Sequence, residues 1–185
     1  SNRLLQKLDL EKQNNGSDTM SDDELKTMVD IGENQGNLEE QESQLIQNVI
    51  QFGETSAEEI MTPRIEMFTL DINETLDEIL PKIIENFYSR VPILDEKGEE
   101  VKGFLFTKDL NKFKTSPDNF KLKNHLREPL FIPQSKNIKE LLEEFKKKKR
   151  HMAVVLDEFG SVCGLVTLED ILEELVGEID SEMRE

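Results

Sequence analysis

The chain has 185 residues, 34% of them are charged, and the formal net charge at pH 7 is −17. This charge repels a phosphate backbone, so nucleic acid is excluded as an expected partner. The length suits one ordinary domain or two small ones with a real core. No apolar run approaches the roughly 20 residues of a membrane-spanning helix, and no signal peptide is evident. We therefore expect a soluble chain.

Residues that bind metals or form disulfides are scarce. A single cysteine, Cys163, lies in an apolar strand pattern, so an internal disulfide is impossible. His125 and His151 are far apart, and no third ligand type lies at coordinating spacing. We therefore expect no catalytic metal, and His151 is expected to lie at a strand edge with no special task.

Residues 1–53 are predicted to form a polar linker with short helices that ends in an amphipathic helix. Ser21 and Glu24 have the spacing of a capping box, which is a signature of a helix N-terminus. Residues 38–52 place apolar side chains on one face, which predicts a helix that needs a partner surface. Gly53 is a typical stop for that helix.

From residue 54 onward the chain contains two copies of one pattern, which we assign to residues 54–118 and 119–177. The matching positions are Leu70, Leu76, Ile79, Leu80, Leu94, Asp95, Glu96, Gly98, Gly103, Asp109 and Leu110 in the first copy, and Ile132, Ile138, Leu141, Leu142, Leu156, Asp157, Glu158, Gly160, Gly164, Asp170 and Ile171 in the second. Each copy is small and would bury only a small hydrophobic core by itself, so the two should pack together.

The pattern within each copy predicts an α/β (α+β) fold with the order β-α-β-β-α. The predicted strands and helices are Glu66–Leu70, Thr75–Phe87 and Val91–Leu94 in the first copy, and Leu130–Ile132, Ile138–Lys147 and Ala153–Leu156 in the second, each followed by a glycine turn, a further strand and a short helix. We expect the two repeats to pack through their sheets.

The segment GLVTLED, which joins the last strand to the last helix, is the strongest candidate for a binding motif. Thr167 has the side chain of a helix cap, and a helix N-terminus with a hydroxyl beside it suits an anion. Asp170, one turn later, is placed to accept hydrogen bonds from sugar hydroxyls. A capped helix after a strand is also common architecture, so the motif alone leaves both interpretations open.

The segments EEIMTPR, SRVPIL, HMAVVLDEFG and GLVTLED together resemble a tandem pair of CBS (cystathionine-β-synthase) domains. Their combination is similar to the CorC/HlyC family of membrane-bound magnesium and cobalt transport proteins, which are also described as hemolysin-like and are related to the cyclin M transporters. The resemblance covers roughly Ser21 to Asp180. In that family a transmembrane domain precedes the pair and a small domain follows a tail like that at Val176–Ile179.

The resemblance implies that this chain is a fragment from the cytosolic face of the cell membrane, with residues 178–185 leading toward a further domain. It also implies adenine nucleotide binding, as AMP, ADP or ATP, in a cleft between the copies. The family motif G-x-x-T-x-x-D is complete in the second copy, at Gly164, Thr167 and Asp170. In the first copy Phe106 replaces the threonine and Thr107 comes one residue late, so we expect one competent site and one degraded site.

The first copy is expected to supply the other wall of the competent site. The residues concerned are Thr62, Tyr88, Ser89, Arg90, Val91 and Pro92. Arg90 offers a fork for phosphate oxygens, and Tyr88 offers a flat face for adenine. Main-chain groups near Val91 and Pro92 would read the edge of the base. Taken alone, Arg90 could equally pair with one of the 40 acidic residues, and Pro63 could simply interrupt the chain before a strand.

We therefore expect a regulatory module of a divalent-cation transporter that binds AMP or ATP, with or without Mg²⁺, and forms a homodimer through its CBS repeats. Residues 38–52 would carry the signal to a membrane domain outside this chain. The alternative is a ligand-free dimerisation module. An enzyme is not expected, because no Walker motif or activated nucleophile is visible. The basic run Lys146–Arg150 is interpreted as a solvated helix end that complements the helix dipole.

Overall fold

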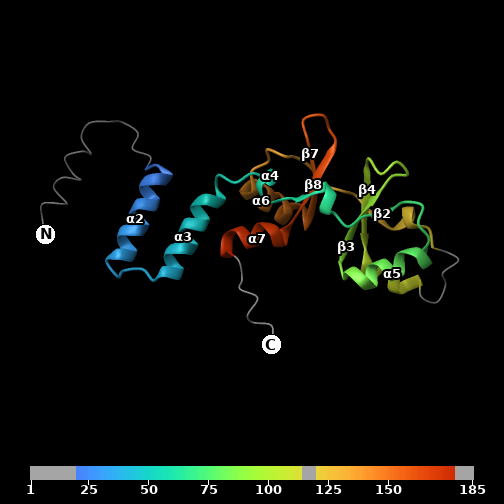
Figure 1. The fold of residues 1–185 in the computed structure, drawn as a ribbon, viewed down its shortest axis with the longest axis horizontal. Coiled ribbons are helices and arrows are strands. Elements are labelled where there is room, and N and C mark those ends of the chain that lie inside the picture. Colours follow the sequence, from blue (N-terminus) through green and yellow to red (C-terminus); the bar gives the residue numbers. More distant parts are fainter. Residues whose placement is uncertain (1–19, 114–119, 178–185) are drawn as a thin grey trace, which may run out of the picture. The chain divides into compact units, whose positions relative to one another are not determined.

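The computed structural model describes residues 20–113 and 120–177, and the chain divides into two compact units, residues 1–50 and 51–185 (Figure 1). The predicted start of the linker and the predicted tail, residues 178–185, lie outside the described residues. Within the two described ranges, every helix is too short or too polar to cross a bilayer.

The described part of the first unit, from residue 20, contains the helices α2 (Asp22–Asn34) and α3 (Glu40–Phe52), and α3 extends past the boundary at residue 50. The capping box predicted from Ser21 is confirmed, because its hydroxyl accepts the N–H of Glu24 and the Glu24 carboxylate accepts the N–H of Ser21. Gln47 of α3 donates a 2.8 Å hydrogen bond to Asp30 of α2, which ties the two helices together. The predicted amphipathic helix is confirmed, with its start two residues later than expected.

The second unit contains two four-stranded sheets, one for each copy of the repeat. In spatial order, the first sheet consists of β2 (Leu70–Asp71), β3 (Arg90–Leu94), β4 (Val101–Phe106) and β5 (Leu126–Arg127), and the second of β1 (Thr62–Pro63), β8 (Val162–Thr167), β7 (Met152–Leu156) and β6 (Phe131–Pro133). In both sheets a parallel pair, β2 with β3 or β6 with β7, is followed by an antiparallel hairpin. The predicted mixed α/β class is confirmed.

Each sheet is completed by a strand from outside its own copy. β1 precedes the first copy's sheet in the chain but pairs with β8 of the second, with Thr62 opposite Leu165. β5 precedes the second copy's sheet but pairs with β4 of the first, with Arg127 opposite Phe104. The repeat pattern did not predict this exchange, which brings Thr62 beside the strand that ends at Thr167.

Helices connect and cover the strands of both sheets. They are α4 (Ala57–Ile60), η1 (Arg64–Glu66), α5 (Leu76–Asn86), η2 (Thr107–Phe113), η4 (Leu122–His125), α6 (Ile138–Lys148) and α7 (Leu168–Val176), where η marks a 3₁₀ helix. The strand predicted over Glu66–Leu70 is misplaced: the chain forms a 3₁₀ turn after Pro63, and the strand, β2, begins only at Leu70. Met67 and Phe68 in this irregular segment are partly buried and pack against two different apolar clusters, which explains an apolar pattern without a strand.

Three apolar clusters form the interior. One belongs to the first sheet, centres on Ile79 and Val91 and also takes in Leu122. Another belongs to the second sheet, centres on Leu141 and Phe145 and also takes in Phe52 and Ala57. The third joins the two sheets and contains Val101, Phe104, Val154 and Leu165. The predicted packing of the repeats through their sheets is therefore confirmed.

Cys163 lies on β8 and contributes to the second copy's core. Its thiol donates toward the carbonyl oxygen of Val155 at 3.4 Å. Burial, with a smaller contribution from the nearby Asp157 carboxylate, raises the pKa of the Cys163 thiol. The group therefore stays protonated at neutral pH, as suits a structural cysteine rather than a nucleophile.

Candidate functional site

A cavity of about 390 Å³ between the two copies, which we call the first cleft, brings together seven of the eight predicted site residues. They are Thr62, Tyr88, Ser89, Arg90, Pro92, Thr167 and Asp170. Val91 is the exception, since its side chain is fully buried in the core of the first copy. Residues from β1, β3 and the start of α7 converge here because the exchanged strand β1 lies against β8.

Thr167 and Asp170 are held by each other at the start of α7. The Thr167 hydroxyl oxygen accepts the N–H of Asp170 at 3.2 Å, and Asp170 Oδ2 accepts the N–H of Thr167 at 2.7 Å. A hydroxyl that accepts one bond still has a proton to donate. No hydrogen bond to Asp170 Oδ1 is formed within the described residues. The capping box therefore fixes both side chains while a donor and a carboxylate oxygen remain for a ligand.

An aromatic pair forms the opposite side of the first cleft. The rings of Phe68 and Tyr88 stack with centroids 5.4 Å apart and planes at 26°.

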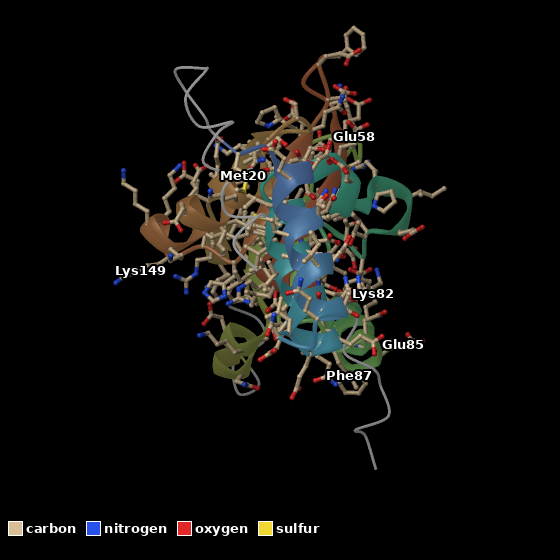
Figure 2. The ribbon with its side chains drawn as sticks, turned by 90° about the vertical axis from the view of Figure 1, so that its left-hand side faces the viewer. Met20, Glu58, Lys82, Glu85, Phe87 and Lys149 are labelled. Atoms are coloured by element: carbon tan, nitrogen blue, oxygen red, sulfur yellow. The ribbon has the colours of Figure 1, made fainter. Side chains whose placement is uncertain are left out.

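Phe87, just before Tyr88, ends α5 in the left-handed region with φ 56°, and Lys149 ends α6 in the same way with φ 52°. Both project outward in Figure 2. This costly conformation at matching repeat positions turns the chain sharply from each helix toward the next strand.

Arg90 lies on the boundary of the first cleft and has no ion-pair partner among the described residues. Its guanidinium carbon lies 4.9 Å from the centre of the Phe106 ring, a cation–π contact. The alternative interpretation, in which Arg90 pairs with an acid, is therefore not the arrangement observed in the described part of the chain. Arg90 also lines a second cavity, together with Phe106.

Eight residues of the first cleft were not predicted: Glu66, Met67, Phe68, Phe87, His151, Met152, Leu165 and Glu169. His151, expected at a strand edge with no special task, directly precedes β7 and lines both cavities. Its repeat position, equivalent to that of Ser89, was the signal that could have identified it. Among the described residues, no group of three or more His, Cys, Asp or Glu side chains is arranged to hold a metal ion.

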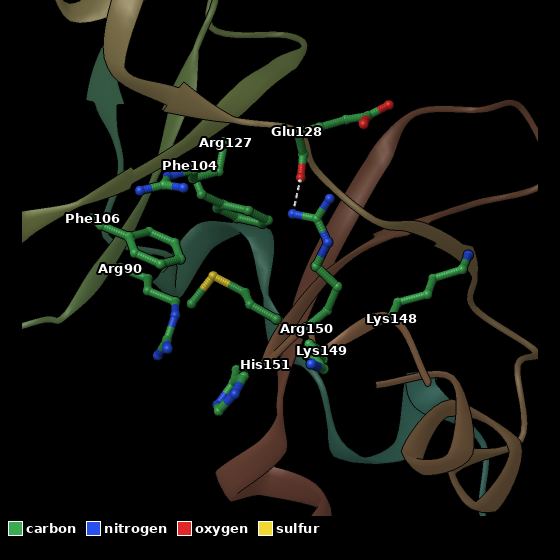
Figure 3. Close-up of a pocket in the computed structure, with 10 residues that line it drawn as sticks. Arg90, Phe104, Phe106, Arg127, Glu128, Lys148, Lys149, Arg150 and His151 are labelled. Atoms are coloured by element: carbon green, nitrogen blue, oxygen red, sulfur yellow. Dashed lines mark hydrogen bonds between the residues drawn. The ribbon is translucent and has the colours of Figure 1, made fainter. Parts of the chain in front are cut away.

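The second cavity, which we call the second cleft, has a volume of about 380 Å³ and a different chemistry (Figure 3). Its lining consists of Arg90, Phe104, Phe106, Arg127, Glu128, Lys148, Lys149, Arg150, His151 and Met152. Phe106 pairs with Arg90 in the first sheet as Thr167 pairs with Met152 in the second, so the phenylalanine occupies the threonine's place. Asp109 is ion-paired with Arg127 at 3.1 Å.

Two sequence interpretations concern the second cleft. Thr107, which comes one residue too late for the motif, donates its hydroxyl to the carbonyl of Ser89 and lines neither cleft. The basic run after α6 is only partly a solvated helix end. Lys148 forms a 2.5 Å ion pair with Glu144, but it lines the second cleft together with Lys149 and Arg150.

Comparison with known proteins places this geometry in a family. A family model described as CBS domain matches residues 57–115 and 125–177. The magnesium and cobalt efflux protein CorC of Escherichia coli strain K12 is 41% identical over 165 residues, which are 88% of this chain and 56% of that protein. The chain thus spans about half the length of the curated relatives it matches.

Solved structures give the same result at the level of the fold. The CBS domain of a bacterial CNNM/CorC family Mg²⁺ transporter has a TM-score of 0.79 and 37% identity, and the match covers 86% of this chain and 98% of that one. A structure of such a domain described as a complex with ATP has a TM-score of 0.71 and 39% identity, and the match covers 75% and 99%. The chain therefore belongs to the CBS-domain family, as a CBS pair of the CNNM/CorC type.

Proposed function

We propose that this chain is the regulatory module of a divalent-cation transport protein and that its first cleft binds an adenine nucleotide, AMP or ATP. The observation that carries the proposal is the meeting, in one cavity of about 390 Å³, of a capped helix start, an aromatic wall and an arginine without an ion-pair partner among the described residues. A related CBS domain described as a complex with ATP supports the same ligand class. The alternative, a ligand-free module, gives no role to these groups.

Each group in the first cleft suits one part of a nucleotide. Asp170, whose Oδ1 forms no bond within the described residues, would accept from the ribose hydroxyls. Thr167 and the N–H of Glu169 at the start of α7, which has no partner among the described residues, would donate to a phosphate. Arg90 would add a charged fork for phosphate oxygens, and Tyr88 would face the adenine ring. Thr62 and Ser89 would complete the polar lining, with main-chain groups near Val91 and Pro92 beside the base.

We propose that Mg²⁺, when present, enters with ATP rather than at a site of its own. Glu66 and Glu169 line the same cleft as the proposed phosphate donors. These carboxylates would repel a nucleotide triphosphate, and a bound divalent cation would relieve that repulsion. ATP is therefore expected to bind better with Mg²⁺ than without it, whereas AMP should respond less.

We further propose that two copies of the chain form a homodimer and that the module lies at the cytosolic face of the membrane. Three apolar side chains on the helices are exposed to water: Ile84 of α5 at 65%, and Leu172 and Val176 of α7 at 44% and 53%. Exposed apolar surface is unfavourable, and a partner copy that covers these side chains would remove it from water. Nucleotide binding would change how the two repeats, assigned to residues 54–118 and 119–177, are arranged relative to each other. Residues 38–52 would transmit that change to the transport domain, provided that the nucleotide binds the two geometries unequally.

Calorimetric titration with AMP and ATP, each with and without Mg²⁺, tests the nucleotide proposal. We expect saturable binding of one nucleotide per chain. At a hundredfold excess over Kd the ligand should stabilise the fold by about 2.7 kcal/mol, visible as a higher melting temperature. No heat at millimolar nucleotide, no thermal shift and a stable dimer by light scattering would instead favour the ligand-free module. Turnover of ATP by the pure chain would indicate an enzyme.

A further inference from the structure

We propose that the second cleft is a separate binding site for a compact polyphosphate-type anion and that it does not accept a nucleoside. This inference concerns a different cavity from the first cleft and does not depend on nucleotide binding there. It rests on three properties of the residues around Phe106: their positive charge, their arrangement, and the lack of free hydrogen-bond acceptors for sugar hydroxyls among those described.

Positive charge is concentrated in the second cleft although the chain as a whole carries −17. Among the described residues that line this cleft, five are arginine or lysine and a single one, Glu128, is acidic. Glu128 takes part through its main chain, because its carbonyl accepts a 3.0 Å hydrogen bond from Arg150. Figure 3 shows its carboxylate extending away from the labelled rings. Arg127 pairs with Asp109 and Lys148 pairs with Glu144, but neither acid lines the cleft. Arg90, Lys149 and Arg150 form no ion pair among the described residues, so the net charge of the cleft stays positive.

Three of these cations are guanidinium groups that reach the cleft from separate parts of the chain. Arg90 begins β3, Arg127 ends β5, and Arg150 follows α6. The guanidinium carbons of Arg90 and Arg127 lie 4.9 and 5.0 Å from the centre of the Phe106 ring. Holding like charges together costs free energy, which an anion would repay. Planar guanidinium forks match the oxygens of phosphate groups, so the arrangement suits a phosphate chain.

The same cleft lacks the groups that would hold a ribose. Phe106 replaces the hydroxyl that Thr167 provides in the first cleft. Asp109, at the repeat position of Asp170, is engaged by Arg127 at 3.1 Å and its side chain is only 15% exposed. A site that offers hydrogen-bond donors but few carboxylate acceptors favours a small anion that has no sugar hydroxyls.

Arg90, His151 and Met152 line both clefts. If Arg90 turns toward a ligand in one cleft, it withdraws charge from the other. The two ligands should therefore weaken each other, and by linkage the factor must be the same in both directions. A surface that attracts anions by its positive charge alone would not show this mutual weakening of the two ligands.

Titration of the whole chain with tripolyphosphate, followed by calorimetry at about physiological salt, tests the site. We expect one ion per chain, and weakening by roughly tenfold to a hundredfold in Arg127→Gln and in Arg150→Gln, as for loss of one charged hydrogen bond. Lys82→Gln removes a cation that pairs with Glu74 outside both clefts and is the matched control. It should bind tripolyphosphate like the unaltered chain, and thermal melting verifies that each variant folds.

Other outcomes would overturn the proposal. Absence of saturable binding, or equal weakening in Lys82→Gln, would mean that only general charge attracts the ion. Weakening in Asp170→Asn with full affinity in Arg127→Gln would place the ion in the first cleft. Arg127→Gln should leave ATP affinity unchanged, and ATP binding that depends on Arg127 would assign the second cleft to the nucleotide's own phosphates. Tripolyphosphate binding that depends on Arg127 in a chain that binds no nucleotide would refute only the proposed function.

Discussion

Replacing Asp170 with asparagine is expected to weaken adenine-nucleotide binding by roughly tenfold to a hundredfold and to leave the fold intact. A hydrogen bond to a charged group contributes about 1.5–3 kcal/mol, which corresponds to this range of affinity. Asparagine keeps the shape of the side chain and one acceptor oxygen, so the N–H of Thr167, now bonded at 2.7 Å, retains its partner. Calorimetric titration with ATP and AMP measures the effect, and the two nucleotides should lose similar amounts because they share the ribose.

A second variant separates binding from helix capping. Thr167→Ala removes both a phosphate donor and the cap of α7, so it should lower stability by about 1 kcal/mol as well as weaken binding. Thr75→Ala is the matched control, since Thr75 is the N-cap of α5, donates both its N–H and its hydroxyl to Glu78, and lies outside both clefts. It should lower stability by a similar amount with unchanged nucleotide affinity. Full affinity in Asp170→Asn and Thr167→Ala would refute the proposed site even if a nucleotide binds.

The repeat made much of this fold predictable from the sequence. Positions such as Ile79 and Leu141 recur with the same spacing and occupy the centres of two separate cores. Local signals were also reliable where one side chain decides the structure, as for the caps at Ser21 and Thr167. Comparison of the copies identified Phe106 at the position of Thr167, which the sheet registers of the two copies confirm.

Features that depend on contacts between distant segments were not predictable. β1 and β5 are two residues long, and a strand of that length has no periodicity to detect. Arg127, His151 and Arg150 acquire a common environment only because the exchanged strands place them around one cavity. A basic run at the end of a helix gives the same local pattern whether it faces water or a cleft.

The exchanged strands require glycine at the positions they cross, so Gly164→Ala is expected to destabilise the second unit by about 1–3 kcal/mol. A Cβ atom at Gly164 would lie 2.7 Å from the carbonyl oxygen of Thr62 and 2.6 Å from the Met61 sulfur. The sulfur can move, but the carbonyl belongs to β1, so the strand itself must shift. Gly164 does not have a positive φ, and the effect therefore measures contact rather than backbone strain. Denaturant unfolding followed by circular dichroism gives the loss.

Gly103→Ala is the matched control because it makes the same intrusion at the other exchanged strand. Its Cβ would lie 2.7 Å from Leu126 Cβ and 2.9 Å from the carbonyl oxygen of Arg127. Both variants should lose similar stability, but displacement of β1 moves Thr62 in the first cleft, whereas displacement of β5 moves Arg127 in the second. Gly164→Ala should therefore weaken nucleotide binding while Gly103→Ala leaves it intact and weakens tripolyphosphate binding. Equal losses of nucleotide affinity would mean that the exchanged strands stabilise the pair as a whole and do not shape the two clefts separately.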